Sequence, residues 1–229
     1  IAIEAFKKGL SQPQDVAIYL EDEPDATYGA LAKEALRLIA ALRDLGLSAG
    51  DVISFQFPNW REGAVVDIAA AALGLVVNPI VPIYRDAELR FILSDAESKL
   101  ILIPDQHRSI DYVNMICRLR PELPCLEHVV TLRATAEYPD TTRYEQLIDC
   151  DPADESSLPV IDPNSIKCRL YTSGTTGFPK AVLHSHNTLT RIIDNTSDHS
   201  GTNSTDVMMM PSPITHITGY SSGLNLPFI

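Results

Sequence analysis

The chain contains the stretch Tyr171-Thr172-Ser173-Gly174-Thr175-Thr176-Gly177-Phe178-Pro179-Lys180, in which hydroxyl side chains and glycines precede a lysine. Its two glycines can adopt positive φ, which lets backbone N–H groups approach an anion closely. The hydroxyl groups add hydrogen-bond donors, and the lysine adds positive charge. The stretch therefore predicts a loop that binds a polyphosphate.

The spacing of the two glycines excludes one common type of phosphate loop. A Walker A loop has four residues between its glycines, followed at once by a lysine and by a serine or threonine for magnesium. Here two residues separate Gly174 from Gly177, and Ala181 follows Lys180. An ordinary surface turn is the other alternative, but ten consecutive residues of mixed type exceed what a turn requires.

Size and charge limit the class of protein. The 229 residues, 45% of them hydrophobic, are enough for one large domain or two small ones. A formal net charge of −12 argues against general binding to nucleic acid. The apolar run 68–82 is interrupted and too short to span a bilayer, and no basic and apolar leader opens the chain. We expect a globular cytoplasmic protein that does not bind nucleic acid.

The cysteines do not form a recognisable motif. They are too widely and irregularly spaced for a zinc site or a disulfide scaffold. We expect reduced thiols at Cys117, Cys125, Cys150 and Cys168.

Hydrophobic periodicity upstream of the loop alternates between strands and helices. Thr27 is expected to cap a helix that ends at Gly46. Further strands are expected at 52–57, 76–81, 100–103 and 129–132, with helices at 60–73, 86–96 and 110–119. Strands at 166–170 and 181–184 are expected on either side of the loop. This order predicts an α/β fold with a mostly parallel sheet covered by helices on both faces.

The composition changes to Asp, Glu, Ser and Pro between residues 149 and 163. Such a segment is typical of a solvated connection. We therefore expect a first α/β subdomain at 1–163 and a second, incomplete unit at 164–229 that begins with the loop hairpin. Because the chain starts at Ile1 and ends in the apolar segment 225–229, we expect it to be part of a longer protein.

The ten-residue stretch resembles the signature of the adenylate-forming (AMP-binding) superfamily, which includes acyl-CoA synthetases, adenylation domains and luciferases. The usual form is Tyr-Thr-Ser-Gly-Thr-Thr-Gly-x-Pro-Lys-Gly, and Ala181 stands where the family has its last glycine. Segments 27–31 and 72–80 are similar to earlier elements of the family. The resemblance therefore covers the chain from about residue 15 to its end and implies the N-terminal subdomain of such an enzyme.

The resemblance also implies an activity. In this superfamily a carboxylate attacks the α-phosphorus of ATP to give an acyl-adenylate and pyrophosphate, and a thiol, usually of coenzyme A, then displaces AMP. Both first reactants are anionic, so donors, lysine and Mg²⁺ must offset their repulsion. By resemblance, the residues that bind the β- and γ-phosphates are Thr172, Ser173, Gly174, Thr175, Thr176, Gly177 and Lys180. No catalytic residue or metal ligand is assigned within the chain, because the family's Mg²⁺ ligand is expected downstream.

The family places its acyl pocket in a segment that corresponds here to residues 208–220. The resemblance assigns His216, Ile217 and Gly219 to that pocket, although His216 could instead be a buried, hydrogen-bonded histidine. Residues 207–229 contain no Asp, Glu, Lys or Arg, so this wall offers no fixed charge to a substrate. Amino-acid adenylation domains usually have an aspartate near here, and aryl-acid members often have Asn where Ile217 stands. We expect an uncharged aliphatic or alicyclic acid, as in ligases for short- to medium-chain or cyclohexanecarboxylate-type acids.

Two other functions are open from the sequence. The thiol acceptor could belong to a carrier protein rather than to coenzyme A, or the chain could be a binding module that keeps the fold without activity. A serine hydrolase with Ser173 as nucleophile lacks the Gly-x-Ser-x-Gly elbow, and His184 and His186 are expected to be structural.

We expect the 229-residue chain alone to be nearly inactive, because the family's Mg²⁺-binding glutamate, its ribose-binding aspartate and its C-terminal lysine all follow this region. Isotope exchange between pyrophosphate and ATP, measured on this chain with an aliphatic acid, checks the expectation. Robust exchange would show it to be wrong.

Overall fold

The structure is a computed structural model that describes residues 2–21, 23–172 and 179–228. Its main feature is a seven-stranded sheet in the order β11-β10-β4-β3-β5-β8-β9. All neighbouring strands in this sheet are parallel except β10 and β11. Its strands are β3 (Val52–Phe55), β4 (Val76–Pro79), β5 (Ser98–Pro104), β8 (His128–Leu132), β9 (Thr142–Arg143), β10 (Ile166–Thr172) and β11 (Lys180–Ser185).

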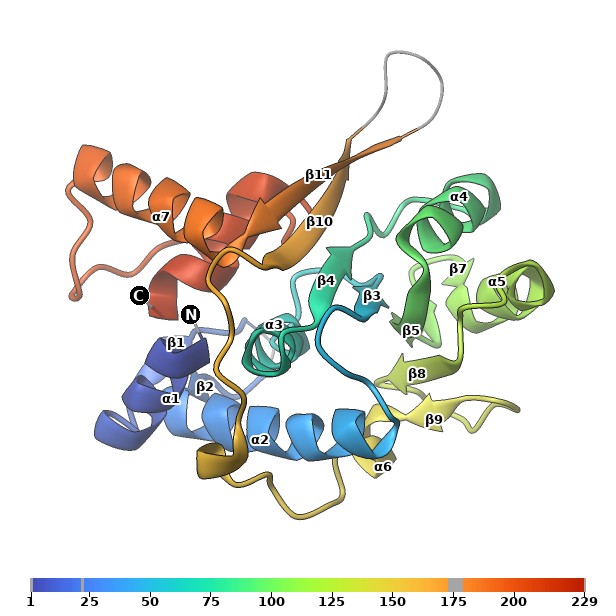
Figure 1. Cartoon of the computed structure of the whole chain (residues 1–229), viewed down its shortest axis with the longest axis horizontal. Helices are drawn as coiled ribbons and strands as arrows, with labels where there is room; N and C mark the ends of the chain where they lie inside the picture. Colours follow the sequence, from blue (N-terminus) through green and yellow to red (C-terminus); the bar gives the residue numbers. More distant parts are fainter. Residues whose placement is uncertain (1, 22, 173–178, 229) are drawn as a thin grey trace.

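Helices cover both faces of this sheet (Figure 1). One core contains residues of α1 (Ala2–Ser11), α2 (Tyr28–Asp44) and α3 (Glu62–Leu73), and the other contains residues of α4 (Asp86–Ala96) and α5 (Tyr112–Leu119). Strand β5 contributes Leu100 and Leu102 to the first core and Ile101 and Ile103 to the second. This alternation follows from the two-residue period of a strand. The predicted α/β class with a mostly parallel, doubly covered sheet is therefore confirmed.

The remaining elements are short or lie outside the central layers. Two small antiparallel pairs are formed by β1 (Val16–Ile18) with β2 (Ala26–Thr27) and by β6 (Gln106–His107) with β7 (Ile110–Asp111). The other helices are α6 (Tyr144–Leu147), α7 (His186–Ser200), the π-helix η3 (Gly219–Asn225) and the 3₁₀ turns η1 (Arg120–Glu122), η2 (Glu155–Ser157) and η4 (Leu226–Phe228).

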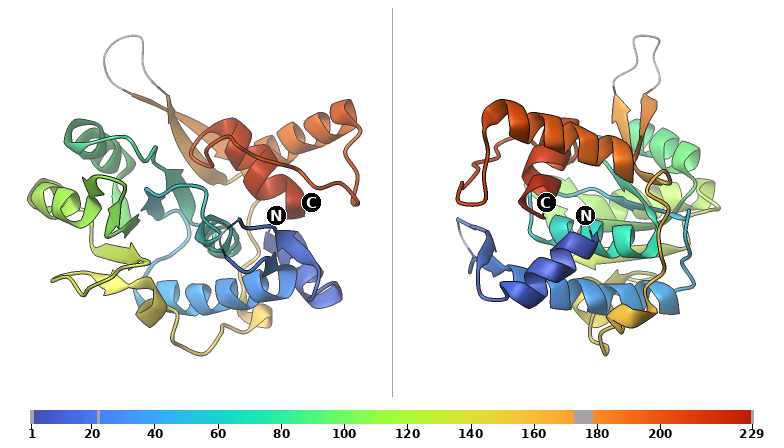
Figure 2. Two further views of the ribbon diagram at one scale, coloured as in Figure 1. Left: turned by 180° about the vertical axis from the view of Figure 1, so that it is seen from behind. Right: turned by 60° about the vertical axis from the view of Figure 1, so that its left-hand side comes forward.

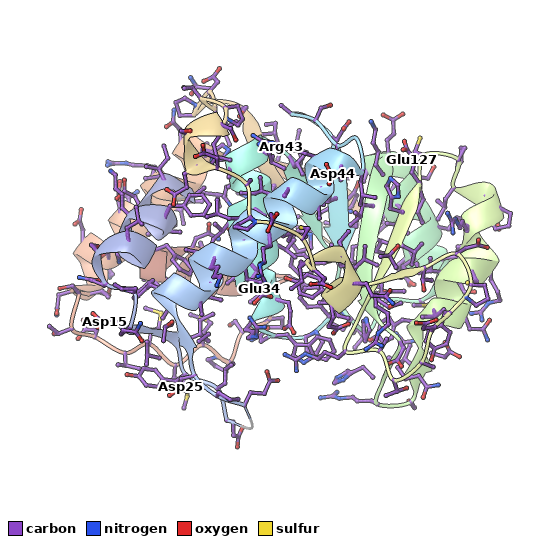
Figure 3. All side chains as sticks on the ribbon, turned by 90° about the horizontal axis from the view of Figure 1, so that it is seen from below. Asp15, Asp25, Glu34, Arg43, Asp44 and Glu127 are labelled. Atoms are coloured by element: carbon purple, nitrogen blue, oxygen red, sulfur yellow. The ribbon has the colours of Figure 1, made fainter. Side chains whose placement is uncertain are left out.

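The predicted helix after Thr27 is α2, and the Thr27 side chain accepts a hydrogen bond from the backbone N–H of Ala30. This contact is the N-cap expected from the sequence. Seen from below in Figure 3, α2 runs across the molecule, with Glu34 along it and Arg43 and Asp44 at its end. The predicted helix at 86–96 matches α4, whereas the one expected from residue 60 begins at Glu62.

Helix α3 is buried along its whole length. It packs against α1 and α2 as well as against the sheet, so its sequence is apolar on every side except at Glu62 and Asp67. A buried carboxylate needs a partner. Glu62 forms an ion pair with Arg133, and Asp67 forms one with Lys167.

The expected strands on either side of the phosphate loop are β10 and β11, which form an antiparallel hairpin with Tyr171 opposite Ala181 and Thr172 opposite Lys180. The loop therefore joins two strands, as predicted. Strand β10 also pairs in parallel with β4 through Cys168 and Val77. Figure 2 shows from two sides that this hairpin rises out of the body of the molecule.

Residues near the two ends of the chain lie side by side (Figures 1 and 2). The side chains of Lys8 and Tyr28 both donate to the backbone oxygen of Pro227, at 3.0 and 2.9 Å. The ring of Phe228 meets that of Tyr28 edge to face at 5.8 Å between centroids. Residues 227 and 228 therefore contact the first two helices, α1 and α2.

The acidic segment at 149–163 is mostly exposed, as its composition predicts. It is nevertheless attached to α2, because Ala153 N donates to Leu36 O and Arg43 donates to the Ser157 hydroxyl at 2.9 Å. The division into subdomains at residue 163 stays a prediction.

The four cysteines are free thiols. Burial raises the pKa of the Cys168 thiol to about 12. No helix in the described part of the chain is long and apolar enough to cross a bilayer.

Gly74 and Gly201 allow a matched test of crowding at a helix end. Both end a helix in the left-handed conformation, at φ 70° and 68°. A Cβ at Gly74 would lie 3.0 Å from Ile161 Cδ1 and 3.2 Å from Ala49 Cβ, whereas one at Gly201 would meet open space. We expect Gly201→Ala to lower the free energy of unfolding by about 1–2 kcal/mol and Gly74→Ala by about 2–4 kcal/mol. Denaturant unfolding measures the free energy of unfolding of both variants. Equal losses would show that crowding around Gly74 does not add to the cost of the substitution.

Candidate active site

The residues predicted to bind phosphate lie at the outer end of the β10–β11 hairpin. Thr172 is the last residue of β10 and Lys180 the first of β11. The two residues are paired across the hairpin, and the Thr172 hydroxyl lies 3.4 Å from the Lys180 backbone oxygen that accepts its hydrogen bond. The other predicted phosphate ligands lie outside the described residues: Ser173, Gly174, Thr175, Thr176 and Gly177.

The side chain of Lys180 is exposed, and it forms no ion pair with the residues that the structure describes. An ammonium group without a carboxylate partner can still neutralise a bound anion. In a chain with a net charge of −12, such local positive charge is what an anionic ligand requires.

Helix α4 supports the base of the hairpin. The Tyr171 hydroxyl donates to Asp95 Oδ2 at 2.5 Å, and Arg169 donates to the Asp95 backbone oxygen at 3.1 Å. Burial, and then the neighbouring Asp95 carboxylate, raise the pKa of Tyr171, so the phenol keeps its proton. The tyrosine of the ten-residue stretch therefore anchors the strand rather than facing a ligand.

The residues predicted to line the acyl pocket lie just before and within η3. His216 is exposed, Ile217 packs partly against the core, and Gly219 is buried. The exposure of His216 argues against the alternative of a buried core histidine. A Cβ at Gly219 would overlap the backbone oxygen of Pro213, so only glycine allows the chain to turn this closely.

Asn59 holds this segment in place, and the sequence analysis assigned it no role, since it lies between the strand expected at 52–57 and the helix expected at 60–73. Its side-chain oxygen accepts from Ile214 N at 2.9 Å, and its side-chain nitrogen donates to Ser212 O at 3.0 Å. No local pattern reveals a contact between residues so far apart in the sequence.

A buried polar cluster of Lys167, Asp67 and Tyr220 was also missed. Lys167 Nζ lies 2.5 Å from Asp67 Oδ1 and 3.0 Å from the Tyr220 hydroxyl, and Tyr220 also donates to Asp67. All three side chains are almost completely buried. Burial, followed by Asp67, raises the pKa of Tyr220 well above its ordinary value. The signal that could have found the pair is a single charged residue, Asp67 or Lys167, in each of the otherwise uncharged segments 63–73 and 166–168.

The two histidines near β11 are partly buried. Burial lowers the pKa of His184, and burial with the nearby Lys167 charge lowers that of His186 to about 4. Both are therefore neutral near pH 7. His186 Nε2 is buried without a hydrogen-bond partner in the described residues, and its role stays a prediction of the sequence analysis.

No hydrogen bond or ion pair joins Thr172 or Lys180 to residues 216–219 in the described part of the chain. The two predicted sets therefore form two candidate surfaces: Thr172 and Lys180 offer a hydroxyl and a cation, and residues 216–219 contain no Asp, Glu, Lys or Arg. Together they can bind an anion and an uncharged group. The described residues include no cluster of three or more His, Cys, Asp or Glu side chains able to bind a metal ion.

Comparison with known proteins gives a consistent result. Residues 6–229 match the model of a family described as AMP-binding enzyme. The chain is 31% identical to a medium-chain fatty-acid–CoA ligase of Escherichia coli K12 over 96% of its own length and 38% of that protein. It is 32% identical to a sulfoacetate–CoA ligase of Cupriavidus necator over 84% of its own length and 36% of that protein.

A solved structure, acetoacetyl-CoA synthetase from Streptomyces lividans, superposes with a TM-score of 0.83 at 25% identity. The match covers 97% of this chain and 37% of that one. The chain thus spans well under half the length of each of these three proteins.

Replacing Asn59 by alanine removes the bonds that hold residues 212–214. We expect Asn59→Ala to lower the free energy of unfolding by about 1–2 kcal/mol, since each hydrogen bond contributes about 1 kcal/mol, and to speed amide hydrogen exchange at Ile214. Asn187→Ala is the control, because Asn187 also donates from its side chain, to Asn164 Oδ1 at 2.8 Å. Unchanged exchange at Ile214 in Asn59→Ala would contradict the assignment.

Proposed function

The chain belongs to the family of AMP-binding enzymes, and from that premise we propose that the intact protein is an acid–thiol ligase. A carboxylate oxygen attacks the α-phosphorus of ATP, the bond to the β-phosphate oxygen breaks, and pyrophosphate leaves. The thiol of coenzyme A then loses its proton to solvent, its sulfur attacks the acyl carbonyl, and AMP leaves with the electrons of the acyl–oxygen bond. The products are an acyl-CoA thioester, AMP and pyrophosphate.

The observation that carries this proposal is the hairpin that presents Thr172 and Lys180 opposite each other at its outer end. An exposed ammonium without an ion pair in the described residues suits the phosphates of ATP, whose negative charge grows on the departing pyrophosphate. In the proposed site Ser173, Gly174, Thr175, Thr176 and Gly177 supply further donors from the loop.

The proposed acyl group is uncharged and aliphatic or alicyclic. The wall at 207–229 has no ionisable Asp, Glu, Lys or Arg, and a charged substrate group would lie there without a partner. The relative named medium-chain fatty-acid–CoA ligase agrees with this proposal better than the one named sulfoacetate–CoA ligase, whose acid carries a sulfonate.

The chemistry of the described residues fits the phosphates of ATP but does not supply a metal site. Thr172 and Lys180 offer a hydroxyl and a cation to phosphate oxygens. The described residues contain no group of three or more His, Cys, Asp or Glu side chains that could hold Mg²⁺, and the family's Mg²⁺ ligand is expected downstream of this chain. The thiol of coenzyme A enters the proposal as a substrate, with no residue of this chain assigned to it.

Replacing Lys180 by alanine in the intact protein tests the phosphate site. We expect pyrophosphate–ATP exchange to fall at least tenfold, because about 1.4 kcal/mol of lost transition-state stabilisation is a factor of ten. Lys7→Ala is the control, since Lys7 is also exposed but lies on α1, paired with Glu4 at 2.8 Å. Exchange is measured with hexanoate, octanoate, cyclohexanecarboxylate and an amino acid, and coenzyme A is then added to follow thioester formation.

Unchanged kinetics in Lys180→Ala would remove the phosphate assignment. Exchange with the amino acid but not with the aliphatic acids would contradict the proposed substrate class. Exchange without thioester formation would favour a carrier-protein thiol, and no exchange with any acid would favour a binding module.

A further inference from the structure

The buried cluster of Lys167, Asp67 and Tyr220 joins three elements that are far apart in the sequence. Lys167 lies on β10, Asp67 on α3 and Tyr220 on η3. Lys167 and Tyr220 are 0% exposed and Asp67 is 1% exposed. The ammonium also lies 5.0 Å from the centre of the Tyr220 ring. The function proposed above uses none of these three side chains.

Stability alone does not explain this cluster. A buried ion pair loses the hydration of both charges, and well-packed apolar residues often stabilise a core equally well. Apolar contacts do not fix the orientation of a side chain, whereas hydrogen bonds do. The Tyr220 hydroxyl bonds both Lys167 and Asp67, which fixes the position of the ring.

The backbone and neighbours of Tyr220 hold the residues predicted to line the acyl pocket. Tyr220 N donates to His216 O at 2.8 Å, and the hydroxyl of Ser221 donates to Ile217 O at 2.7 Å. Asn225 donates to Tyr220 O at 2.7 Å from within the core. A shift of Tyr220 would therefore move the turn that contains His216 and Ile217.

The other end of the cluster lies on the strand that enters the phosphate loop. Lys167 precedes Thr172 on β10, whose backbone is held on one side by β4 and on the other by β11. In the described residues, the side-chain hydrogen bond between β10 and residues 206–228 is the one from Lys167 to the Tyr220 hydroxyl. Tyr220 is therefore the polar connection between the two candidate surfaces.

We infer that Tyr220, held by Lys167 and Asp67, is a positioning residue that sets the acyl-binding turn at His216–Gly219 relative to the strand that enters the phosphate loop. The inference rests on the proposed function, because it concerns how that site binds its acid. Lys167 and Asp67 act through Tyr220 and touch no substrate.

The test compares two tyrosines in the intact protein. Tyr220→Phe removes the hydroxyl that bonds the cluster. Tyr144→Phe is the matched control, because Tyr144 is also buried and donates to a carboxylate, Glu34 Oε1, at 2.8 Å. Glu34 lies on α2, on the opposite side of α3 from the hairpin (Figures 1 and 3). The KM for the acid and the KM for ATP are measured for each variant by pyrophosphate–ATP exchange.

We expect Tyr220→Phe to raise the KM for the acid at least about tenfold, in line with the loss of hydrogen bonds to charged groups, with less than about a twofold change in the KM for ATP. Tyr144→Phe leaves both values unchanged. Ser221→Ala loses only the hydrogen bond to Ile217 O, and we expect it to raise the KM for the acid by a smaller factor without changing the KM for ATP. It replaces Tyr220→Phe in the test if that variant does not fold. Equal changes in both KM values, no change, or the same change in Tyr144→Phe would overturn the inference.

Amide hydrogen exchange separates this inference from the proposed function. If the unaltered protein shows no pyrophosphate exchange with any acid, the proposed function fails, but the structural link can still be measured. Faster amide exchange at residues 216–221 in Tyr220→Phe than in Tyr144→Phe would then support the positioning of the turn. Identical exchange in the two variants would overturn it.

Discussion

Helix α3 is buried on every side, and its two carboxylates require cations from elsewhere in the chain. Glu62 receives two hydrogen bonds from Arg133, at 3.0 and 2.9 Å, and Asp67 receives one from Lys167 at 2.5 Å. Arg133 follows β8, and Lys167 lies on β10. Because an unpaired charge inside a protein is costly, these two pairings fix how α3 sits against strands on both sides of β3.

The backbone and contacts of Arg133 show how the chain supplies a cation to the buried Glu62 carboxylate. Arg133 adopts a φ of 52°, uncommon for a residue with a side chain, and its guanidinium lies 4.3 Å from the centre of the Trp60 ring. It also pairs with Glu23. The strained backbone places one cation against two carboxylates and an aromatic face, and these contacts offset the local cost.

Much of the fold could be predicted because its signals are local. The N-cap at Thr27, the helix at 86–96 and the alternation of strands and helices follow from side-chain chemistry and periodicity over a few residues. Helix α7 was missed because only Leu189 and Ile193 are buried on it, too few for a clear apolar stripe. The short strands β1, β2, β6, β7 and β9 have no periodicity to detect, since two or three residues cannot show one.

The amino-acid sequence by itself determined the α/β class, the position of the glycine- and threonine-rich loop between two strands and the absence of charge along residues 207–229, because each depends on residue types that are close together in the chain. Only the tertiary structure decided that Asn59 holds residues 212–214 and that Lys167, Asp67 and Tyr220 meet in the core. These contacts depend on which strands become neighbours, here β10 beside β4. Because a buried charge needs an oppositely charged partner, Lys167 pairs with Asp67 in the core. No local pattern in the sequence predicts that pairing.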